Sequence, residues 1–266
     1  MPRSFTRLLL SLFLSLLAAN ASIGLAQNVQ YSPALNQARE SGGFHGAIVT
    51  LDTASDKYLA SDTKMVHTGF IPASTFKIFS SLVALETGVV SHDDLLIWDG
   101  VVRDRSEINR DLTLVEAFAL SALPHYQQLV REIGKAEMKG FLTSVGYGNA
   151  NMDGGLDRFW IDGGLRISPI QQVQFLERLL ANRLPFSLET MKTVKKLLLN
   201  AYPDPSISAK TGWTDIEGQN FGWWVGWKVN QGDPVVFATI LLTDSPGDGF
   251  GKARIDVTRK VLSLDR

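Results

Sequence analysis

The chain has 266 residues, of which 45% are hydrophobic and 20% are charged, a composition typical of one large or two small globular domains and not of a disordered or fibrous chain. Its 26 basic and 27 acidic residues leave a formal net charge of −1, which gives no electrostatic basis for binding nucleic acid or an anionic membrane. Cysteine is absent, which excludes disulfides, thiol nucleophiles and thiolate zinc sites, and the four histidines lack the spacing of a zinc hydrolase.

The first 26 residues have the layout of a secretory signal peptide. Arg3 and Arg7 precede an apolar run over 8–19, and small residues then offer cleavage after Ala21 or Ala26. This run is shorter than the roughly 20 residues that span a bilayer, and no later stretch is apolar enough to do so. We therefore expect cleavage, preferably after Ala26, to release residues 27–266 as a single domain, free of the membrane, in a bacterial periplasm.

The patterns along this domain predict an α+β fold. An apolar run and a polar turn predict a β-hairpin over 46–60, and an apolar helix follows Pro72 and ends at Gly88. Strands near both ends of the chain predict one antiparallel sheet flanked by helices, with a helical subdomain inserted at roughly 100–200. The later predicted elements are helices over 124–133, 136–144, 168–181 and 187–199, strands over 206–211, 221–229 and 235–243, and a helix over 253–264.

Two Ser-x-x-Lys motifs, at 61–64 and 74–77, could supply a serine nucleophile with a lysine base. The first lies in a polar segment, where Asp62 would keep Lys64 charged, so we expect it on the surface. The second opens the apolar helix and places Ser74 and Lys77 one turn apart on the same face.

The position of the second motif has chemical consequences. A serine at a helix N-terminus lies beside free N–H groups that can stabilise an oxyanion, and burial lowers the proton affinity of a lysine. The alternative is structural: Ser74 caps the helix, and Lys77 extends its amine to solvent.

A Lys-Thr-Gly sequence ends the first of the late strands. On an edge strand, the Lys210 ammonium and the Thr211 hydroxyl could bind a substrate carboxylate, while Gly212 would allow close backbone approach.

The order and distance of these motifs in a secreted α+β chain resemble the penicillin-recognising serine enzymes, and further motifs narrow the resemblance to the class D, or oxacillinase-type, β-lactamases. The resemblance spans essentially the whole mature chain and implies a β-lactamase/transpeptidase-like fold, with hydrolysis of penicillin-type β-lactams through an acyl-serine. The motifs that carry it are Pro-Ala-Ser-Thr-Phe-Lys at 72–77, Trp-Asp-Gly at 98–100, Tyr-Gly-Asn at 147–149, Phe-Trp at 159–160, Ile-Ser at 167–168, Lys-Thr-Gly-Trp at 210–213 and Gly-Trp-Trp-Val-Gly-Trp at 222–227.

The resemblance implies a role for each residue that matches the family's pattern. Ser74 is the acylated nucleophile, and Lys77 is the general base in the form of N6-carboxylysine, made with CO2 or bicarbonate, with no other cofactor and no metal. Trp160 holds this carbamate through its indole N–H, although a core aromatic is equally compatible with the sequence. Ser121 relays a proton or contacts the leaving nitrogen.

The substrate-binding residues are implied in the same way. The backbone N–H groups of Ser74 and Trp213 form the oxyanion hole, and Lys210, Thr211 and Arg254 bind the substrate carboxylate. Gly212 also belongs to the implied substrate-binding residues. An arginine near the start of a terminal helix is, however, more often solvated.

One position departs from the family's pattern, because Leu123 stands where a valine is usual. The bulkier side chain is expected beside the modified lysine and predicts altered deacylation or an altered substrate profile.

Two other functions share part of this pattern. A penicillin-sensor domain acylates without turnover but normally follows several membrane spans, and a D,D-peptidase lacks the motifs at 147–149 and 223–227. The sequence also leaves open whether the chain forms a homodimer.

Overall fold

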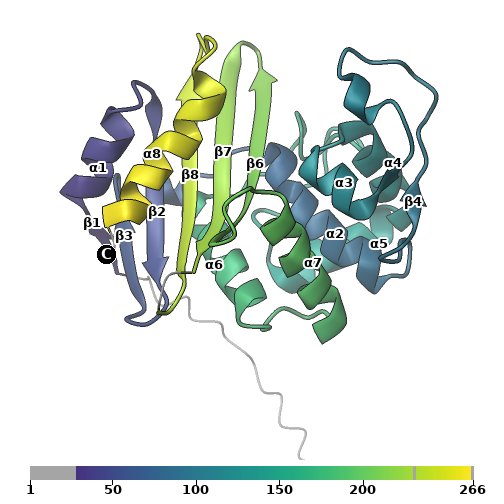
Figure 1. Cartoon of the computed structure of the whole chain (residues 1–266), viewed down its shortest axis with the longest axis horizontal. Helices are drawn as coiled ribbons and strands as arrows, with labels where there is room; N and C mark the ends of the chain where they lie inside the picture. Colours follow the sequence, from purple (N-terminus) through teal and green to yellow (C-terminus); the bar gives the residue numbers. More distant parts are fainter. Residues whose placement is uncertain (1–27, 230–231, 265–266) are drawn as a thin grey trace, which may run out of the picture.

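The structure is a computed structural model that describes residues 28–229 and 232–264 (Figure 1). The predicted signal peptide, 1–26, lies outside the described residues. Among the described residues, none of the helices is both long and apolar enough to cross a bilayer.

A six-stranded sheet with the order β1-β3-β2-β8-β7-β6 forms the frame of the molecule. Strands β2 and β8, from opposite ends of the chain, pair antiparallel over the whole length of β2, as the sequence predicts. The exception is β1, which runs parallel to β3. Because β1 is short and mostly exposed, it has no period-two pattern that could reveal it. The strands are β1 (Val29–Tyr31), β2 (His45–Asp52), β3 (Lys57–Ala60), β6 (Ile207–Ile216), β7 (Gln219–Lys228) and β8 (Val235–Thr243).

Helices cover both faces of this sheet, as Figure 1 shows. On one face, α1 (Pro33–Glu40) and α8 (Phe250–Leu264) pack against β2 and β8 through Ile48 and Leu241. Ala47 and Val49 point to the opposite face and join the main hydrophobic core. This burial on both sides explains the continuous apolar run of β2, since a strand between two helical layers has no solvent face.

The main core lies between the sheet and the remaining helices. A two-stranded sheet, β4 (Leu95–Leu96) with β5 (Leu112–Thr113), lies among them in the sequence. The helices are α2 (Phe76–Glu86), α3 (Leu114–Ala119), α4 (Leu123–Ile133), α5 (Lys135–Val145), α6 (Pro169–Leu180) and α7 (Leu188–Asn200).

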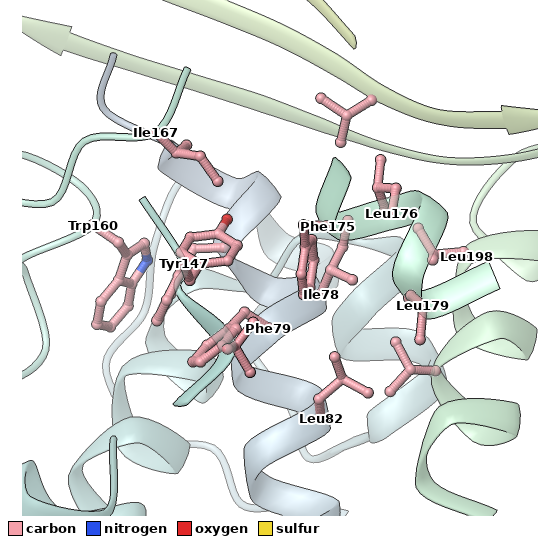
Figure 2. Packing of buried hydrophobic residues seen from close by; sticks show 14 of the residues in the cluster. Ile78, Phe79, Leu82, Tyr147, Trp160, Ile167, Phe175, Leu176, Leu179 and Leu198 are labelled. Carbon is pink, nitrogen blue, oxygen red and sulfur yellow. The ribbon is translucent and has the colours of Figure 1, made fainter. Parts of the chain in front are cut away.

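Helix α2 is at the centre of this core. It is buried on every side from residue 76 to residue 84, and Figure 2 shows Ile78, Phe79 and Leu82 packed among side chains of α6 and α7. A helix enclosed on every side is expected to be mostly apolar, and within 76–84 only Lys77, Ser80 and Ser81 are polar. Lys77 lies on this helix and is therefore enclosed by the core.

The predicted helices over 124–133, 136–144, 168–181 and 187–199 are confirmed to within two residues at each end. The last helix begins at Phe250, three residues before the predicted start. The short helices α1 and α3 were not predicted.

The first Ser-x-x-Lys motif differs from its predicted surface position in one residue. Ser61 is buried, and its hydroxyl accepts a hydrogen bond from the Ile48 N–H at 2.8 Å. Lys64 is exposed as expected, and the Asp62 carboxylate accepts hydrogen bonds from the Lys64 and Met65 N–H groups. The serine thus satisfies a backbone donor of β2, and the prediction that it lies on the surface is wrong.

Candidate active site

Ser74 lies in the short 3-10 turn Ala73–Thr75 that leads directly into α2. Two long-range hydrogen bonds fix this turn: the Ala73 N–H donates to the Trp160 carbonyl at 2.9 Å, and the Trp223 indole donates to the Ile71 carbonyl at 2.8 Å. Ala73 has φ of +49°, an unfavourable value for a residue with a side chain, which the surrounding contacts sustain. Thr75, and not Ser74, occupies the cap position of α2, so the structural alternative of Ser74 as a cap is wrong.

Lys77 lies one turn below the serine and is completely buried. Its Nζ donates a hydrogen bond to Ser74 Oγ at 2.9 Å and lies 5.2 Å from the centre of the Tyr126 ring. Burial, followed by the charges of Lys210 and Arg105, lowers the pKa of Lys77 well below its usual 10.5. The alternative of an amine extended to solvent is therefore wrong, and the geometry suits a lysine that accepts a proton from the serine.

Ser121 and Lys210 form a second serine–lysine pair in the site. Ser121 lies in the turn between α3 and α4 with φ of +54°, and its Oγ accepts a hydrogen bond from Lys210 Nζ at 3.0 Å. The same ammonium donates to the Thr211 carbonyl at 3.1 Å. Burial, then the charges of Arg254 and Arg105, lowers the pKa of Lys210 to about 7. This lysine can therefore supply a proton, relayed through the Ser121 hydroxyl, to a basic leaving group.

Strand β6 carries the Lys-Thr-Gly sequence at the edge of the sheet, as predicted. The prediction that this sequence ends the strand is wrong, because β6 continues to Ile216. A Cβ atom added at Gly212 would lie 3.0 Å from the Pro72 carbonyl oxygen and 3.1 Å from the Thr75 nitrogen. Glycine is thus needed here because the edge strand is pressed against the turn that holds the nucleophile.

Replacing Gly212 by alanine is expected to lower the kcat/KM of the site by about 10- to 100-fold, since the nucleophile turn must move away from β6. The matched control is Gly140→Ala, in α5, where an added Cβ meets nothing within 4 Å. The control should keep full activity and gain slightly in melting temperature. Equal activity of the two variants would contradict this account of Gly212.

Arg254 of α8 closes the site behind β6. It is 9% exposed, its Nη1 donates to the Gly212 carbonyl at 3.1 Å, and its guanidinium carbon lies 5.5 Å from the Trp213 ring centre. Burial lowers its pKa to about 10. The alternative of a solvated arginine is wrong. Trp213 itself is 43% exposed at the mouth of the site, with its indole N–H donated to Asn220.

Trp160 is buried and stacks on Phe76, with ring centres 5.1 Å apart and planes at 27°. Its indole Nε1 has no hydrogen-bond partner among the described residues. Figure 2 shows Trp160 at one side of the core, near Tyr147. Since a buried N–H without a partner costs about 1–3 kcal/mol, this donor points to an acceptor that the side chains alone do not supply.

Leu123 is the first residue of α4, half-buried and packed against the main core. Its effect on deacylation stays a prediction.

The structure adds two residues that the sequence did not single out. Tyr126 contacts Lys77 and also shares a 2.8 Å hydrogen bond with Ser81. Arg105 lies in a polar loop, and its charge acts on both buried lysines. Neither residue belongs to a recognisable motif, so only the folded chain reveals them.

The site is rich in buried basic side chains. No carboxylate among residues 28–229 and 232–264 forms an ion pair with Lys77, Lys210 or Arg254. Over the same residues, no group of three or more histidine or acidic side chains is placed to hold a metal ion. An anion is the ligand that such a set of side chains would recognise.

Comparison with known proteins identifies the family. The penicillin binding protein transpeptidase domain matches residues 25–263. Beta-lactamase OXA-5 of Pseudomonas aeruginosa is 37% identical over 250 residues, which cover 92% of this chain and 93% of that protein. The crystal structure of the class D β-lactamase YbXI from Nostoc superposes with a TM-score of 0.81 at 37% identity, over 87% of this chain and 98% of that one.

The chain belongs to the class D β-lactamases. This confirms the resemblance and the fold predicted from the motifs. The C-terminal domain of the BlaR penicillin receptor of Bacillus licheniformis also shares the fold, with a TM-score of 0.82 at 28% identity, over 90% of this chain and 97% of that domain. The BlaR1 protein of that organism is 32% identical, but the match covers 85% of this chain and only 37% of BlaR1. A class D fold therefore occurs both in hydrolases and in a receptor.

Proposed function

We propose that the chain hydrolyses the β-lactam ring of penicillin-type antibiotics through an acyl-Ser74 intermediate and so confers antibiotic resistance. The hydrogen bond between Lys77 and Ser74 carries this proposal, because it joins a nucleophile to a buried amine of low proton affinity. The proposed place of action is the periplasm, since residues 1–26 resemble a cleavable signal peptide.

The acylation step uses both serine–lysine pairs. Ser74 Oγ bonds to the lactam carbonyl carbon while its proton passes to the base at Lys77. The ring C–N bond then breaks, and Ser121, which accepts a hydrogen bond from Lys210, is placed to pass a proton to the leaving nitrogen. The backbone N–H groups of Ser74 and Trp213 would hold the oxyanion.

The substrate carboxylate would lie against Lys210, Thr211 and Arg254. The two cations of this set, Lys210 and Arg254, have no acidic partner in the described part of the chain, which favours an anionic substrate over a neutral one.

The residues around Lys77 fit a carbamate on its amine. CO2 reacts with a neutral amine, and burial of Lys77 favours this form. The unpartnered Trp160 N–H offers a donor to the added carboxylate. When present, the carbamate would supply the oxygen base for acylation and for the attack of water on the acyl-enzyme.

A second candidate, a receptor that is acylated without turnover, is favoured by the similarity to the BlaR domain. Nitrocefin and oxacillin hydrolysis by residues 27–266 separates the two, with mass spectrometry of the protein during the reaction. Many turnovers per molecule, lost in Ser74→Ala, would support the hydrolase. One covalent adduct per molecule with no further product would support the receptor.

A further inference from the structure

Arg105 lies on the loop before the 3-10 turn Ser106–Ile108, outside the set of residues to which a role is assigned above. Its side chain is 51% exposed. Nη2 donates to the Leu120 carbonyl at 2.8 Å, and Nε donates to Glu107 Oε1 at 3.0 Å. Nη1 has no hydrogen-bond partner within the described part of the chain. The arginine is thus held at two points and keeps one edge of its guanidinium free.

The accepting carbonyl places this guanidinium at the wall of the active site. It belongs to the peptide bond between Leu120 and Ser121, and Ser121 in turn accepts the hydrogen bond of Lys210. The pKa values of Lys77 and Lys210 are both lowered, mainly by burial and also by neighbouring cations that include Arg105. The field of Arg105 therefore reaches the place where the bond is broken, although its side chain is at the rim.

The charges in the site leave Arg105 without an assigned anion. Lys210 and Arg254 lie where the carboxylate of the lactam nucleus is expected, from the β6 side of the site. Arg105 lies instead at the turn between α3 and α4, where it donates to the Leu120 carbonyl. Its partner Glu107 is itself 47% exposed, so a ligand can compete with this carboxylate for the guanidinium.

We propose that Arg105 is a specificity-determining residue that favours β-lactams with a second anionic group on the side chain, and that Glu107 opposes it by competing for the same guanidinium. This inference rests on the proposed function and extends it to a substrate class. A bidentate guanidinium–carboxylate contact is the interaction expected between Arg105 and such a side chain.

The test compares benzylpenicillin with carbenicillin, because carbenicillin carries one additional side-chain carboxylate. The measured quantity is the ratio of kcat/KM for carbenicillin to kcat/KM for benzylpenicillin. Arg105→Gln should lower this ratio about three- to tenfold, and Glu107→Gln should raise it about two- to fivefold. In the unaltered chain, the ratio should fall as NaCl is raised to 0.5 M, because salt screens exposed charges.

Arg110→Gln is the matched control. Arg110 is 52% exposed, pairs with Glu116 and donates to a backbone carbonyl, but it is not among the charges that act on Lys77 or Lys210. Its ratio should stay within twofold of the unaltered chain. Glu107→Gln also guards against a folding artefact, because it leaves the bond from Arg105 to Leu120 in place and shifts the ratio in the opposite direction.

The outcomes separate the two levels of the proposal. Hydrolysis of both penicillins with the same ratio in all four proteins would overturn the role of Arg105 and leave the proposed function intact. Stoichiometric acylation without turnover of either penicillin would overturn the proposed function itself. Opposite shifts in Arg105→Gln and Glu107→Gln would support the inference.

Discussion

Replacing Lys77 by methionine should stabilise the fold and abolish β-lactam turnover at the same time. Methionine fills a similar volume without placing an amine in the core, so the free energy of unfolding in CO2-free buffer should rise by about 1–3 kcal/mol. Loss of the base should lower kcat for nitrocefin by about a thousandfold or more. Guanidinium unfolding and steady-state kinetics measure the two effects.

The lowered pKa values of the two buried lysines also predict how the stability of the fold changes with pH. In the folded protein, the pKa values of Lys77 and Lys210 lie below the usual 10.5, and that of Lys210 is about 7. Above about pH 7, the unfolded chain therefore binds more protons than the folded protein does. The unaltered protein should therefore gain stability as the pH rises from 7 towards 10. In Lys77→Met the gain should be smaller, because only Lys210 contributes.

The control for this experiment is Lys195→Met in α7, where the amine is only partly buried and bonds to the Asn182 side chain. It should keep normal turnover. A Lys77→Met protein that is less stable than the unaltered chain in CO2-free buffer, or that still hydrolyses nitrocefin at the normal rate, would contradict the assigned role.

Trp160→Phe should make β-lactam hydrolysis dependent on added bicarbonate. The substitution keeps an aromatic ring against Phe76 and removes the unpartnered indole N–H. Without this donor a carbamate on Lys77 is less stable, so kcat in ambient buffer should fall about 10- to 100-fold. Saturating bicarbonate should restore much of the rate, because it drives the same carbamate by mass action.

The matched control is Trp224→Phe. Trp224 is equally buried but lies in the separate cluster with Phe237, on the α8 side of the sheet. This variant should lose stability through the smaller ring yet show no rescue of kcat by bicarbonate. Equal bicarbonate responses in the two variants would contradict the donor role of Trp160.

The sequence predicts the main strands and helices of this molecule well, because they follow from the periodicity of apolar residues. The apolar run of β2 and the mostly apolar sequence of α2 both follow from burial between layers, and both elements are found buried. The short strand β1 and helix α1 escape prediction, since three and eight residues give too few repeats of either period. The parallel pairing of β1 with β3 also depends on contacts that no local pattern encodes.

The residues of the site likewise fall into those that local sequence patterns predict and those that only the fold reveals. Ser74 and Lys77 are predictable as a pair because one helical turn separates them, and motif order adds Lys210. The contact between Lys210 and Ser121 joins residues 89 positions apart and is set by the fold alone. Arg105 cannot be predicted, because an arginine in a polar loop is indistinguishable from a solvated one until its bond to Leu120 is seen.

The proposed mechanism depends on a carbamate in the pocket around Lys77. Carbon-13 NMR of the protein in 13C-labelled bicarbonate tests it without reference to activity. We expect one carbamate resonance in the unaltered chain, its loss in Lys77→Met, and a weaker signal at equal bicarbonate in Trp160→Phe. No resonance at saturating bicarbonate in the unaltered chain, or a resonance that persists in Lys77→Met, would contradict it.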